Sequence, residues 1–92
     1  MGFSVKVKSV RPLDNLWLCV DFVNGAQKYY DVKQLKDDFP IYGDLYNEDI
    51  FKLVKVDCGG YAVAWNSEID ISECELWDNG ITLEQYNNSR WG

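Results

Sequence analysis

An Asn-Gly pair between two strand-like runs is the feature that most constrains the fold of this chain. It lies in the segment FVNGAQKYYD, residues 22–31. Asn and Gly tolerate the positive φ angles of a two-residue type I′ turn better than other residues, so the pair predicts a β-hairpin. That loop length also predicts the register. The cross-strand pairs would be Asp21 with Lys28, Cys19 with Tyr30, and Trp17 with Val32.

Alternating apolar residues mark the strands themselves. Residues 16–23 carry apolar side chains on both alternating faces, which is typical of a strand covered on both sides. Residues 3–8 alternate between apolar and polar side chains, so a strand there would have one apolar face. A second hairpin is predicted in KLVKVDCGGYAVAW, residues 52–65, with Gly59-Gly60 at its turn and Val56 opposite Val63. Ile69-Asp70-Ile71 is predicted to be a brief last strand.

Two capping patterns predict short helices between and after these strands. Asp31 precedes Gln34 by three residues, and Ser72 precedes Glu75 by the same spacing. With a length of 92 residues, the chain is expected to form one small α+β domain over residues 1–78, with an antiparallel sheet built from the two hairpins. Residues 79–92 show no clear period and are expected to form a loose tail.

Composition excludes several classes of function. The chain contains no histidine, which removes Ser-His-Asp and Cys-His catalysis and every histidine-based metal site. Its net charge of −6 repels phosphate backbones, and only Lys6, Lys8 and Arg11 suggest a basic patch, so direct binding of nucleic acid is not expected. An acidic surface suits a basic protein partner, although it can also serve solubility alone.

The cysteines and the apolar runs indicate the compartment. Three cysteines without a CxxC pair argue against a disulfide framework and favour the reducing cytoplasm. Cys19 and Cys74 are expected to be small buried hydrophobic residues, whereas Cys58, beside the glycine pair, is expected to be exposed. No apolar run approaches the roughly 18–20 residues of a membrane span, so no membrane association is expected.

Carboxylates crowd one segment near the C-terminal end of the predicted domain. They are Glu68, Asp70, Glu73, Glu75 and Asp78. Their spacing does not match an EF-hand loop, so we expect solvated charges and helix-start carboxylates, with no metal, cofactor or catalytic residue. Asp70 differs because two isoleucines flank it. It is expected to accept backbone hydrogen bonds inside a bend.

The aromatic residues leave two interpretations open, core packing and an interaction surface. They lack the interleaved Arg and Lys residues of a base-stacking surface. Trp and Tyr are also the residues that dominate protein–protein hot spots. The candidate interaction surface comprises Trp17, Tyr30, Trp65, Asp70 and Trp77. Trp17 and Tyr30 are expected to share the second face of the first hairpin, exposed or covered by a helix.

The order of these features resembles a family of domains of unknown function, DUF2442. The resemblance covers about Val5 to Trp77 and depends on short motifs. These are Phe22-x-Asn24-Gly25, Asp31 before the short helix, Phe51 leading into Val54 and Val56, and Trp65 followed by Asp70 and Leu76. Where the family often has Pro or Asn-Gly after the Trp, this chain reads Asn66-Ser67-Glu68, so the turn there can differ.

This resemblance implies a small α+β fold of two hairpins, a bacterial cytoplasmic origin, and an antitoxin-like partnership with a small toxin-like protein. It supplies no catalytic residues. We therefore expect a non-enzymatic protein-interaction domain whose partner is basic. The alternative is a sensor domain that binds a small ligand or a divalent metal through the acidic segment. An exposed sheet edge also allows a homodimer.

Overall fold

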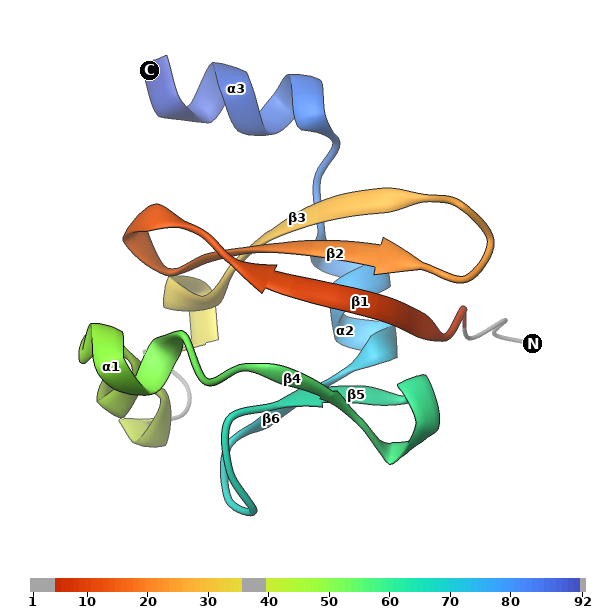
Figure 1. Ribbon diagram of the computed structural model, residues 1–92. Coiled ribbons are helices and arrows are strands. Elements are labelled where there is room, and N and C mark those ends of the chain that lie inside the picture. Colours follow the sequence, from red (N-terminus) through yellow and green to blue (C-terminus); the bar gives the residue numbers. More distant parts are fainter. Residues whose placement is uncertain (1–4, 36–39, 92) are drawn as a thin grey trace.

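Two small antiparallel sheets form the framework of the domain. The computed structural model describes residues 5–35 and 40–91, and within them the first sheet has the order β1 (Val7–Pro12), β2 (Trp17–Phe22), β3 (Gln27–Asp31). The second has the order β4 (Lys55–Asp57), β5 (Ala62–Ala64), β6 (Asp70–Ser72). The predicted α+β class is confirmed. The hairpins form two sheets, with β1 beside β4 where the sheets meet (Figure 1).

Short helices connect and cover these strands. The 3-10 helices are η1 (Asp14–Leu16), η2 (Val32–Leu35), η3 (Pro40–Tyr46) and η4 (Cys58–Gly60). The α-helices are α1 (Glu48–Phe51), α2 (Glu73–Asn79) and α3 (Leu83–Trp91). Both predicted helix starts are confirmed. Ser72 Oγ accepts from the Glu75 amide at 3.3 Å, and Asp31 Oδ1 accepts from the Lys33 amide at 2.9 Å.

The register of the first hairpin is one residue away from the predicted one. Leu18 pairs with Tyr30 and Cys19 with Tyr29. The Phe22 amide donates to the Ala26 carbonyl at 2.8 Å, which closes a three-residue loop. Of that loop, only Gly25 has a positive φ, at 90°. The type I′ prediction is wrong because Asn-Gly also suits a three-residue loop that places glycine alone in the left-handed region.

This one-residue difference decides which side chains enter the core, because neighbouring positions on a strand point to opposite faces. Tyr30 therefore shares the inner face with Leu18, whereas Trp17 packs on the outer face, so the expectation that Trp17 and Tyr30 share a face is wrong. The main core lies between the sheets, and α2 contacts both β3 and β6 behind it (Figure 1). Its fully buried large side chains are Tyr30, Phe22, Leu18, Leu45 and Leu76.

The second hairpin and the last strand follow the predictions. Val56 pairs with Val63 as expected, and Ile71 of β6 pairs with Val63 from the other side. The turn is longer than a glycine pair, since it includes Cys58 with φ 52°. Gly60 has φ 99°, and a Cβ atom there would lie 2.9 Å from the Val7 carbonyl oxygen. This close approach brings the turn of the second sheet against β1.

Residues 79–92 were expected to form a loose tail, but the described part of this segment forms a β-bridge and a helix. Ile81 exchanges two backbone hydrogen bonds with Tyr29, at 2.7 and 2.8 Å. After it, α3 packs on the outer face of the first sheet (Figure 1). The Tyr86 ring stacks on Tyr29 at 4.5 Å and meets Trp17 edge-on at 5.0 Å. The boundary proposed at residue 78 stays a prediction.

No helix in the described ranges has the length and apolar character needed to cross a bilayer.

Candidate functional site

Two of the five residues of the candidate interaction surface are core residues. Tyr30 is 0% exposed and Trp65 is 5% exposed. The Trp65 indole nitrogen donates to the Phe51 carbonyl at 2.8 Å, and the two rings stack with centroids 6.0 Å apart. Burial together with a satisfied polar atom gives both residues a structural role.

The other three residues lie apart from one another. Trp77 is half-buried, edge-on to Phe22 at 5.0 Å and beneath the Lys28 ammonium at 4.1 Å. Trp17 is half-buried against Tyr86. Asp70 is exposed in β6. The structure therefore does not gather the five residues on one surface.

The bend that was expected to use Asp70 uses a neighbouring residue. Asn66 Oδ1 accepts from the amides of Glu68 and Ile69, at 2.8 and 2.9 Å. Asp70 contributes its main-chain oxygen, which accepts from the Tyr42 hydroxyl at 2.6 Å. An Asx turn explains this choice, because an Asn side chain is placed to bond amides two and three residues further along.

The acidic segment does not form a metal site within the described part of the chain, where no group of three or more potential ligands comes together. Glu75 accepts from the Tyr30 hydroxyl at 2.7 Å, and Glu73 is 7% exposed.

The predicted exposure of Cys58 and the predicted burial of Cys19 are confirmed. Cys74 was expected to be buried but is exposed, because its position in the first turn of α2 faces solvent.

Two adjacent hollows, neither of them anticipated from the sequence, meet at Asn15 of η1. The first, which we call the acidic groove, has a volume of about 370 Å³. Its lining comprises Pro12, Leu13, Asp14, Asn15, Leu16, Leu45, Tyr46, Glu48, Phe51 and Lys52. The second, the Trp17 cleft, has a volume of about 510 Å³. It is lined by Asn15, Trp17, Asp31, Lys33, Gln34, Asn79, Ile81 and Ser89.

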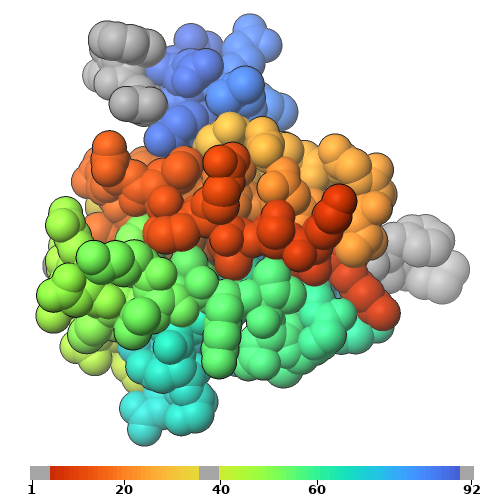
Figure 2. All heavy atoms as spheres, in the orientation of Figure 1, coloured from red at the N-terminus to blue at the C-terminus, as the bar shows by residue number. Residues whose placement is uncertain are grey.

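The acidic groove combines an apolar lining with charged residues. Leu45 and Phe51 are buried, whereas Asp14 and Glu48 are exposed. Neither carboxylate forms an ion pair with any residue the structure describes. Tyr46, also in the lining, is 47% exposed. Figure 2 shows the segment that contains η1, in orange, against the green segment that contains α1, at one side of the molecule.

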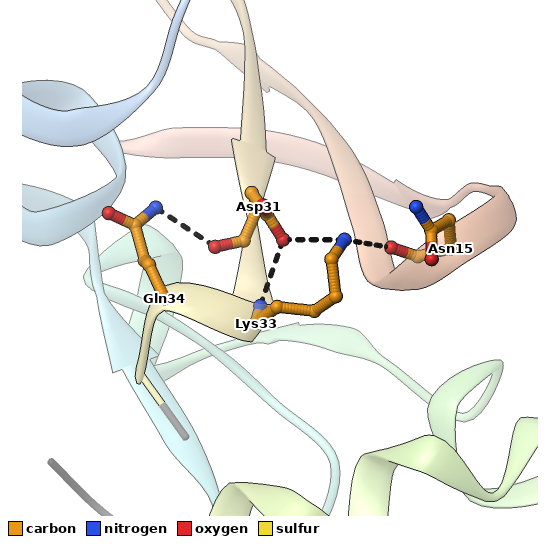
Figure 3. A network of polar contacts seen from close by, with 4 residues as sticks. All are labelled: Asn15, Asp31, Lys33 and Gln34. Atoms are coloured by element: carbon orange, nitrogen blue, oxygen red, sulfur yellow. Dashed lines mark hydrogen bonds and ion pairs between the residues drawn. The ribbon is translucent and has the colours of Figure 1, made fainter. Parts of the chain in front are cut away.

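A polar network fixes one wall of the Trp17 cleft (Figure 3). The Lys33 ammonium pairs with Asp31 Oδ1 at 2.9 Å and donates to the Asn15 carbonyl at 2.5 Å. The side-chain Nε2 of Gln34 donates to the main-chain carbonyl of Asp31 at 2.9 Å. Lys33 also lies 5.6 Å from the centre of the Trp17 ring. The network ties η2 to η1, and Asn15 of η1 lines both hollows.

The turn shared by the two hollows is strained. Asn15 and Leu16 both have φ of 60°, in the left-handed region. That conformation costs roughly 1–2 kcal/mol for a bulky residue such as leucine. Strained backbone of this kind clusters at binding sites, and here it borders both hollows. The sequence signal for it was the Asp14-Asn15 pair, because Asx residues are the non-glycine residues that best tolerate such turns.

Tyr30 and Tyr42 donate hydrogen bonds through their hydroxyl groups. Burial first, and then the hydrogen bond to Glu75, raise the pKa of Tyr30 far above its usual value. Burial also raises the pKa of Tyr42, with Asp70 adding to the effect. Each hydroxyl therefore keeps its proton and donates to an oxygen of the framework.

Comparison with known proteins yields one match. The family described as "Protein of unknown function (DUF2442)" matches the chain over residues 7–82. No curated protein and no solved structure matches the chain.

Proposed function

The chain belongs to the DUF2442 family, and we propose that it is a non-enzymatic protein-interaction domain that binds a basic protein at the acidic groove. One observation carries the proposal. Asp14 and Glu48 line a hollow of mixed polar and apolar surface, and neither has an ionic partner among the described residues. Unpaired carboxylates beside apolar surface attract a basic partner electrostatically and then bury part of it.

The surface around the groove supports this proposal. Six large hydrophobic residues of the described chain are exposed, and three of them come from η3 and the segment around α1. These three are Ile41, Tyr46 and Leu53. Of these three, Tyr46 lines the groove, and exposed apolar surface at a groove is typical of protein-binding sites. The net charge of −6 adds a long-range attraction for a basic partner.

The resemblance stated above extends the proposal to the kind of partner. We propose an antitoxin-like role, in which this domain covers the basic surface of a small toxin-like protein in the bacterial cytoplasm. Such a role requires tight binding and no catalysis. It also accounts for an acidic domain with a preformed groove.

The test is reconstitution with a purified partner. Tagged protein is captured from its host at low salt, and any stoichiometric basic partner is then expressed, purified and titrated by calorimetry. We expect a defined complex whose affinity falls as salt rises from 50 to 300 mM. A partner that is not basic, or an affinity unaffected by salt, would contradict the proposal.

The Trp17 cleft favours a second candidate function, a sensor domain for a small ligand. Its volume of about 510 Å³ lies within the usual range of ligand pockets, and it offers an aromatic ring beside amide and ammonium groups. The metal-binding form of this alternative lacks a ligand cluster in the described ranges. A thermal-shift screen against metabolites and divalent ions tests both forms, because a ligand of the native state raises the melting temperature.

A further inference from the structure

The shape and charge of the acidic groove define one kind of anchor. A volume of about 370 Å³ is at the small end of the range for ligand pockets, which suits one long side chain with its flanking backbone. The lining offers the half-buried side chains of Leu13 and Leu16 for an aliphatic stem, whereas Leu45 and Phe51 are buried. Long cationic side chains bury such stems on apolar surface while the charged end stays near water.

Three residues of the lining can hold the charged end of that side chain. Asp14 comes from η1, and Glu48 comes from the first turn of α1. Carboxylates bind a guanidinium group through paired, charge-assisted hydrogen bonds. Tyr46 presents a half-exposed ring, on which a planar guanidinium stacks better than an ammonium.

We infer that the acidic groove recognises a single arginine side chain of the partner protein, with its stem on the apolar lining and its guanidinium group at Asp14 and Glu48. This inference deepens the proposed function and rests on it. Lys52, the cation of the lining, lies 3.5 Å from Asp49, and neither Asp14 nor Glu48 has an ionic partner among the described residues.

The test uses short peptides followed by ¹H–¹⁵N NMR, and so does not require the natural partner. The probes are acetyl-Gly-Xaa-Gly-amide peptides in which Xaa is Arg, Lys, Leu or Glu. We expect saturable shifts from the Arg peptide at the amides of Asp14, Leu16 and Tyr46. The Lys peptide should bind more weakly, and the Leu and Glu peptides should cause no saturable shift there.

Matched double variants separate recognition from bulk charge. D14N/E48Q should weaken the Arg peptide at least about tenfold, as expected when charge-assisted hydrogen bonds are lost. D57N/E84Q removes the same charge from two exposed residues outside the groove lining and should change affinity less than about twofold. Equal weakening in both double variants would overturn the inference.

Other outcomes also count against the inference. Shifts at the same amides that depend on protein concentration without peptide would identify a second copy as the occupant. Full affinity of D14N/E48Q for a reconstituted partner would refute the groove while the interaction function stands. An Arg peptide that binds the groove in a protein with no basic partner would refute the proposed function and leave the groove's specificity in place.

Discussion

The hydroxyl group of Tyr30 donates a hydrogen bond to Oε2 of Glu75 at 2.7 Å, and this bond joins β3 to α2 across 45 residues of chain. Tyr30 is completely buried, whereas Glu75 is half-buried at the start of α2. Because α2 contacts both sheets, the bond fixes the helix that closes the core. It also satisfies a buried hydroxyl that would otherwise be costly.

Tyr30→Phe should lower the free energy of unfolding by about 1–2 kcal/mol, because it removes a hydrogen bond to a charged acceptor while keeping the ring. Urea unfolding followed by circular dichroism measures the change. Tyr61→Phe is the control, since that ring is 49% exposed, and should change the free energy by less than about 0.5 kcal/mol. Equal effects of the two substitutions would contradict the role given to the Tyr30–Glu75 bond.

Stability should fall at alkaline pH. Burial, followed by the hydrogen bond to Glu75, raises the pKa of Tyr30 in the folded protein, whereas an unfolded tyrosine ionises near pH 10. The stability that the raised pKa of Tyr30 contributes is fully present below about pH 10. Above that pH the unfolded state binds fewer protons, so the free energy of unfolding decreases by up to about 1.4 kcal/mol per pH unit for each such tyrosine.

The substitution Tyr30→Phe removes this contribution and provides the comparison. Urea unfolding at pH 9, 10, 11 and 11.5 should give a shallower decline for the variant than for the unmodified protein. Lysine titration affects both proteins alike and cancels in the difference. Parallel declines would show that Tyr30 ionises as readily in the folded state as in the unfolded state.

The two hairpins show how far local pattern determines this fold. The Val56–Val63 register followed from the sequence because it places two large apolar residues opposite each other on either side of the glycine pair. Around Asn24-Gly25, by contrast, both neighbouring registers place apolar or aromatic pairs across the strands, since residues 16–23 carry apolar side chains on both faces. The length of the loop then decides the register, and Asn-Gly is compatible with loops of two or three residues.

Gly25→Ala tests the geometry of that loop. A Cβ atom at Gly25 would meet nothing within 4 Å, so any cost comes from its φ of 90°. We expect a loss of about 1–2 kcal/mol in the free energy of unfolding. Gly43→Ala is the matched control, because its Cβ atom also has open space and its φ is not in the left-handed range. It should be neutral or stabilise by up to about 1 kcal/mol.

The candidate site was harder to predict than the fold. Aromatic content identified Trp65 and Tyr30, but the same content builds the core, and a single sequence does not distinguish the two uses. The acidic groove depends on the tertiary arrangement by which η1 and α1, far apart in the sequence, line one hollow. Its charges, Asp14 and Glu48, are ordinary surface carboxylates until the fold places them along that hollow.

Tyr86→Ala should release α3 from the first sheet while both sheets stay folded. Among residues 83–89 of α3, Tyr86 is the buried one, and its ring contacts Tyr29 and Trp17. We expect hydrogen exchange of the Tyr86 amide, which bonds the Thr82 carbonyl, to accelerate at least about tenfold. The amides of β2 and β5 should keep their protection. Leu83→Ala, at a 50% exposed position of the same helix, should leave α3 protected. If protection is lost throughout the molecule in Tyr86→Ala, α3 is an integral part of the cooperative core.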